Sequence, residues 1–181
     1  MKKIRFILLF FAFGFAANSQ FSAASLQASG LTCSLCSKAV KVALEKVPFV
    51  QEVKVDIKKQ EYNIVFRENS NISFDKLKDA VEDAGFSVAS LKVTGNFSGL
   101  EIQKDKYITI DGKAFHFLNG YNRQLHGENT FTIVDKNFLS EKDFKKQSSA
   151  TKMECLKSGK AQNCCEKDEL APGTRVYHVI I

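Results

Sequence analysis

Hydrophobic and polar positions alternate and then change period several times between residues 25 and 94. Runs with a period of two predict half-buried strands, and apolar residues at i, i+3, i+4 and i+7 predict amphipathic helices. Pro48 ends the first helical pattern, and Gly85 ends the second, which begins after Ser73 as an N-cap. The predicted order is strand, helix, strand, strand, helix, strand, at 25–31, 39–47, 50–59, 61–68, 73–84 and 86–93.

This order of elements is that of a ferredoxin-like fold. We therefore expect an α+β protein whose first domain, residues 20–94, has a four-stranded antiparallel sheet with two helices on one face. The turn-forming stretch TGNFSG at 94–99 predicts a domain boundary. Residues 95–181 contain further alternating runs, with a hairpin signal at Asp111–Gly112 and a short helix after Ser140. They predict a small β-rich domain, with an OB-like barrel as its topology.

The first 19 residues have a different composition from the rest of the chain. A basic start is followed by an apolar run of about 12 residues, too short for a comfortable membrane span, and then by small residues up to Ser19. This pattern is typical of a secretory signal peptide cleaved near Ser19–Gln20. We expect an exported protein, periplasmic or secreted, with no membrane span in the mature chain.

Charge and cysteine content narrow the function further. The formal net charge of +6 falls to +3 without the three basic residues of the leader, which gives no support for a nucleic-acid partner. The five cysteines would meet an oxidising compartment after export. They form two groups, a pair in GLTCSLC and three in MECLKSGKAQNCC.

Cys33 and Cys36 form a CxxC pair at the predicted start of the first helix. A structural zinc site needs four ligands, and the first domain has no histidine and no second cysteine pair. Thioredoxin-like redox chemistry would need a different fold around the pair. Two thiolates suit a soft ion, Cu(I) or Hg(II), because such ions accept two sulfur ligands. A disulfide between the two cysteines is the remaining alternative.

Residues 25–94 resemble the heavy-metal-associated domain family of copper chaperones, copper-ATPase N-terminal repeats and the periplasmic mercury-binding protein. The resemblance rests on Gly30, Thr32, Cys33 and Cys36, and on the βαββαβ order. It implies that the two cysteines ligate the metal, with Thr32 beside them, and that Phe86 occupies the family's aromatic or lysine position near the site. Leu31 replaces the usual methionine, a change that conserves volume.

The second cysteine group allows two interpretations. Cys155 can form a disulfide with Cys164 or Cys165, which would leave one thiol over in this group. Alternatively, the three cysteines and the thioether of Met153 form a second soft-metal site. His116, His126 and His178 are interpreted as ordinary strand or surface histidines.

These observations predict an exported, non-enzymatic protein that sequesters or hands on a soft metal ion through Cys33 and Cys36. Cu(I) is the expected ion, ahead of Hg(II) and Zn(II). The expected partner is a metal-donor or metal-acceptor protein, either a transporter or a cuproenzyme, which exchanges ligands with the bound ion. The alternatives are a thiol-disulfide redox protein that uses the same pair, and a mercury-binding protein.

Overall fold

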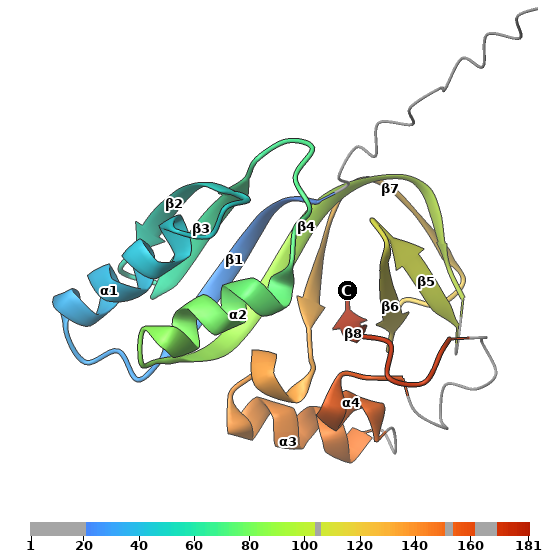
Figure 1. The fold of residues 1–181 in the computed structure, drawn as a ribbon. Helices are drawn as coiled ribbons and strands as arrows, with labels where there is room; N and C mark the ends of the chain where they lie inside the picture. Colours follow the sequence, from blue (N-terminus) through green and yellow to red (C-terminus); the bar gives the residue numbers. More distant parts are fainter. Residues whose placement is uncertain (1–20, 104–105, 151–153, 162–169) are drawn as a thin grey trace, which may run out of the picture.

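The computed structural model describes residues 21–103, 106–150, 154–161 and 170–181 (Figure 1). The predicted leader, residues 1–19, lies outside the described residues, as do Met153, Cys164 and Cys165. The elements of the first half are β1 (Phe21–Ser29), α1 (Ser34–Glu45), β2 (Val50–Asp56), β3 (Glu61–Phe66), α2 (Phe74–Asp83) and β4 (Ser87–Ile102). They confirm the predicted βαββαβ order.

The first four strands are antiparallel neighbours in the order β2-β3-β1-β4, and α1 and α2 cover one face of them (Figure 1). The buried side chains of the two helices follow the predicted stripes and include Val40, Leu44, Leu77 and Val81. Ser73 caps α2 as expected, because its hydroxyl accepts a hydrogen bond from the backbone N–H of Lys76 at 3.4 Å. The ferredoxin-like fold of this half is confirmed.

The turn predicted at residues 94–99 is wrong, because these residues lie inside the 16-residue strand β4. β4 pairs antiparallel with β7 (Arg123–Ile133) from Leu91↔Ile133 to Ile102↔Arg123. The register shifts between Ser98 and Leu100, where Gly99 has φ +81°, so this glycine serves a bulge rather than a turn.

The second half contains β5 (Tyr107–Ile110), β6 (Lys113–Phe117), β7, a 3-10 turn (Lys136–Phe138), α3 (Glu141–Ala150), α4 (Cys155–Ser158) and β8 (Val176–Ile180). The Asp111–Gly112 hairpin and the helix after Ser140 are confirmed. The OB-like barrel is not confirmed. Among the described residues, all strands belong to one sheet, β2-β3-β1-β4-β7-β8-β6-β5, in which β8 is antiparallel to β7 and parallel to β6.

A shared aromatic core joins the two halves. The ring of Phe74, on α2, lies 5.2 Å from that of Phe21 and 5.2 Å from that of Tyr177 on β8, both edge to face. Phe115 on β6 packs against the same three rings. All four side chains are buried. Their contacts lie between elements on both sides of residue 94, and the division into separate domains stays a prediction.

Arg175 adds a polar link between the halves. Its guanidinium donates to both carboxylate oxygens of Asp75 on α2, to Asp135 Oδ2 and to the carbonyl oxygen of Gly159. Burial alone would lower the pKa of Arg175, but the hydrogen bond to Asp75 and the charges of both aspartates raise it above its usual value. The residue therefore stays charged, and its partners offset the cost of burying it.

Candidate metal site at the thiol pair

The loop between β1 and α1 places the two thiols at a helix N-terminus. Gly30 leaves the strand with φ +88°, a conformation that glycine adopts without strain, and a Cβ built there would lie 3.7 Å from the ring of Phe86. Cys33 is the N-cap of α1, with extended backbone angles. Cys36 lies in the first helical turn, so the CxxC spacing brings both side chains to the same end of the helix.

The sulfur atoms of Cys33 and Cys36 are 2.9 Å apart and lie within hydrogen-bonding distance. Cys33 Sγ also accepts a hydrogen bond from the backbone N–H of Cys36 at 3.4 Å, and Thr32 Oγ1 lies 3.8 Å from Cys36 Sγ. The hydrogen bond with Cys33, followed by those with Thr32, lowers the pKa of the Cys36 thiol to about 7. The free pair is therefore partly ionised at neutral pH.

Cys33 is exposed and Cys36 is partly exposed. A cavity of about 420 Å³ opens beside Cys33, and its walls include Leu31, Lys38, Lys41 and Ile57. Two large apolar side chains near the pair face solvent, because Leu35 is 74% and Ile57 is 83% exposed. A partner molecule can thus approach the sulfur atoms directly, over a surface with both apolar and basic groups.

Thr32 Oγ1 lies near Cys36 Sγ, and the ring of Phe86 lies against Gly30, three residues before Cys33. Leu31 packs partly buried against the main core, which agrees with its expected packing role. Their positions alone do not show that these residues help to bind a metal. Their predicted roles at the metal site stay predictions.

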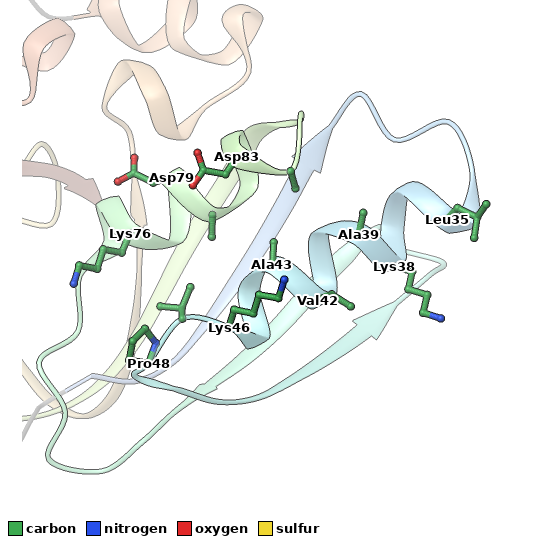
Figure 2. Close-up of a pocket in the computed structure, with 13 residues that line it drawn as sticks. Leu35, Lys38, Ala39, Val42, Ala43, Lys46, Pro48, Lys76, Asp79 and Asp83 are labelled. Carbon is green, nitrogen blue, oxygen red and sulfur yellow. The ribbon is translucent and has the colours of Figure 1, made fainter.

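A larger groove of about 820 Å³ runs between α1 and α2 (Figure 2). Figure 2 shows Lys38 and Lys46 on the α1 side and Asp79 and Asp83 on the α2 side. Its lining contains no sulfur atom and no imidazole, so the groove itself offers no soft-metal ligand. The candidate metal site is the thiol pair, beyond the end of the groove marked by Leu35.

The second cysteine group is described only at Cys155, which is buried in α4 and packs with Ala114 and Val176. The predicted site or disulfide with Met153, Cys164 and Cys165 therefore stays a prediction. Within the described parts of the chain, no three or more His, Cys, Asp or Glu side chains are grouped so that they could hold a metal ion. No helix among the described residues is long and apolar enough to cross a membrane.

The histidines were assigned ordinary roles, but two of them are buried side by side. His116 on β6 and His178 on β8 are 3% and 0% exposed, and their ring centroids are 5.6 Å apart. Sequence reasoning missed this because β6 and β8 are far apart in the chain and pair in parallel. One signal was available, since VYHVI is apolar on both sides of its histidine, as in a strand covered on both faces.

Comparison with known proteins identifies the family to which the first half of the chain is similar. The sequence model of the family described as "Heavy-metal-associated domain" matches residues 25–87. Copper chaperone CopZ of Staphylococcus haemolyticus (strain JCSC1435) is 33% identical over 63 residues, which cover 35% of this chain and 91% of that protein. The mercuric transport protein periplasmic component of Serratia marcescens is 39% identical over 62 residues, or 34% of this chain and 67% of that protein.

A third relative is much longer than the matched region. The probable copper-transporting ATPase HMA5 of Arabidopsis thaliana is 28% identical over 82 residues, which are 45% of this chain but only 8% of the ATPase. The near-complete coverage of CopZ and the family match show that the chain belongs to the heavy-metal-associated domain family. The resemblance inferred from GLTCSLC and the βαββαβ order is confirmed.

Proposed function

We propose that Cys33 and Cys36 bind one soft metal ion, Cu(I), and pass it to or receive it from a partner protein. The observation that carries this proposal is the pairing of two accessible sulfur atoms, 2.9 Å apart, at the N-terminus of α1. The positive end of the helix dipole favours thiolates at this position. The relatives named as a copper chaperone, a copper-transporting ATPase and a mercuric transport protein support a soft ion as the cargo.

Cu(I) suits the two thiols better than Zn(II) does. It accepts two sulfur ligands, whereas Zn(II) would need two more ligands than the described residues bring to this end of α1. Hg(II) also accepts two thiolates, and the mercuric relative makes it the second candidate. To hold an ion between them, the sulfur atoms must move apart from their present 2.9 Å. Each metal–sulfur bond is about 2.3 Å long, so an ion with the two sulfur atoms on opposite sides needs a wider sulfur–sulfur distance.

Transfer proceeds by ligand exchange without a change in oxidation state. A thiolate of the partner forms a third sulfur–copper bond, and the bond to Cys33 or Cys36 then breaks. Cys33 is the more exposed of the two, so we expect its bond to break first. The role is binding and transfer rather than catalysis. The leader-like pattern of residues 1–19 further supports an exported location, in the periplasm or outside the cell.

Cu(I) titration against a competing chelator, under anaerobic conditions, tests the proposal. We expect the intact protein to take up its first equivalent with sulfur ligation. Replacing both Cys33→Ser and Cys36→Ser should weaken that step by at least a hundredfold, while Ser34→Ala, an exposed change at the first residue of α1, should not. Equal affinity of the double variant and the intact protein would overturn the proposal.

The closeness of the sulfur atoms also favours the rival, a thiol-disulfide redox role. Reduction potential and metal uptake separate the two functions. A metal carrier should exchange disulfides slowly and should be protected from oxidation when Cu(I) is bound. Fast exchange with a redox partner, with no uptake of Cu(I), would favour the rival.

A further inference from the structure

Helix α1 has two apolar stripes, and one of them faces the groove between α1 and α2. Val40 and Leu44 are buried in the core, whereas Leu35, Ala39 and Val42 recur at helical spacing along the groove. Leu35 is 74% and Val42 is 39% exposed. Large apolar side chains that share a hollow on the surface commonly mark an interaction site.

The shape of the groove favours a helix as its occupant. Alanines from both helices line it, namely Ala39, Ala43, Ala80 and Ala84, and its volume is about 820 Å³ (Figure 2). Small side chains at a contact let two helices approach closely. The backbone groups of α1 and α2 are bonded within each helix, so an extended segment would find no backbone partners there. A third helix satisfies its own backbone and needs none.

The α1 side of the groove carries positive charge that this chain does not balance. Three lysines of the lining, Lys38, Lys46 and Lys76, form no ion pair with any described residue. By contrast, Lys41 lines the cavity beside Cys33 and pairs with Glu45 at 3.1 Å. The unpaired lysines favour a ligand with acidic side chains.

The α2 side carries the opposite charge. Asp79 and Asp83 face the groove from α2 (Figure 2), and Asp79 is already paired with Lys78 at 2.7 Å. The two walls therefore differ in sign, and a ligand with acidic groups along one flank fits in one orientation, with that flank against α1.

We propose that this groove binds one amphipathic α-helix of the protein that exchanges metal with the thiol pair. Its apolar stripe packs on the alanines and on Val42, and its acidic flank faces Lys38 and Lys46. Leu35, at the end of the groove, is next to Cys36 in the sequence, so a helix bound here brings the rest of the partner to the sulfur atoms. The inference rests on the proposed function for the identity of the partner.

The test uses two labelled synthetic peptides of about 20 residues, long enough to be helical. Both carry leucines on one stripe, and one has glutamates along a flank where the other has lysines. Fluorescence anisotropy with the full chain, free of metal, should show at least tenfold tighter binding of the glutamate peptide. Lys38→Glu with Lys46→Glu should reverse this preference. Equal affinity for both peptides, or binding of neither, would overturn the proposal.

Two exposed apolar positions supply a matched pair of variants. Val42→Asp, inside the groove, should weaken binding of the glutamate peptide by at least tenfold. Ile57→Asp should not, because Ile57 lies beside the thiol pair but lines the other cavity. Equal effects of the two changes would place the peptide elsewhere and contradict the proposal. If Val42→Asp fails to fold, the reversal by the two lysine variants decides. Because no metal is present, failure to bind Cu(I) would contradict only the proposed function.

Discussion

The thiol pair and the histidine pair are built in opposite ways. Cys33 and Cys36 lie at an accessible helix N-terminus, where few contacts depend on them. His116 and His178 lie inside the sheet, and His178 is tied through Asp135 to Arg175 and so to the rest of the fold. A partner molecule can reach the accessible pair directly, whereas the buried pair is covered by the fold. Stability and reactivity should therefore respond differently at the two pairs.

The largest expected change in stability comes from the aromatic core that joins the two halves of the chain. Phe74→Ala removes a fully buried ring that contacts Phe21, Phe115 and Tyr177, and we expect it to lower the free energy of unfolding by about 3–5 kcal/mol. Urea denaturation, followed by probes in each half, should show one transition shifted to lower urea. Val42→Ala, on the exposed side of α1, should change stability by less than about 0.5 kcal/mol.

Separate transitions for the two halves would contradict the shared core and would support the two-domain division predicted from the sequence. In that case only the transition that reports the region around Phe74 would shift in the alanine variant.

The next effect concerns the support of the histidine pair. Asp135→Ala removes the partner of His178 Nδ1 and one of the two carboxylates on Arg175, leaving buried polar groups unpaired. We expect a loss of about 2–3 kcal/mol in unfolding free energy. Asp83→Ala, an exposed aspartate on α2, should have an effect near zero, as should replacing both thiols of the exposed pair by serine. Equal losses in all three proteins would remove the contrast between the two pairs.

The sequence predicted the regions that depend on local pattern. The first half could be predicted because its strands are consecutive hairpins or βαβ units with regular periods, and GLTCSLC lies where β1 leads into α1. The extension of β4 could not be predicted, because Gly95 and Gly99 are typical turn residues. Only pairing with the distant β7 makes them part of a strand. The histidine pair was missed for the same reason, since β8 inserts between β7 and β6.

A smaller effect is expected on thiol reactivity. The pKa of Cys36 is about 7 in the free protein, so thiolate and alkylation rate should rise with pH through neutrality. Cys33→Ala removes the side-chain hydrogen bond that contributes most to this lowering. The pKa should then rise towards the usual cysteine range, and alkylation at pH 7 should slow by roughly tenfold. Mass spectrometry of pulse-alkylated Cys36 measures the rate, and an unchanged pH profile would show that Cys33 is not the cause.

The smallest expected effect is on Cu(I) affinity, and it should show whether the loop before the thiol pair positions the sulfur atoms. Gly30 and Gly85 have nearly equal φ values, +88° and +87°, and both replacements by alanine are strained by about 1 kcal/mol. Only Gly30 lies between β1 and the thiol pair, and a Cβ there would meet Phe86 at an ordinary contact distance of 3.7 Å. Both variants should unfold at slightly lower urea concentration, but only Gly30→Ala should lower the affinity for the first Cu(I), by a few-fold. If Gly85→Ala weakened Cu(I) binding equally, the effect would be one of general stability, and the loop would not be what positions the sulfur atoms.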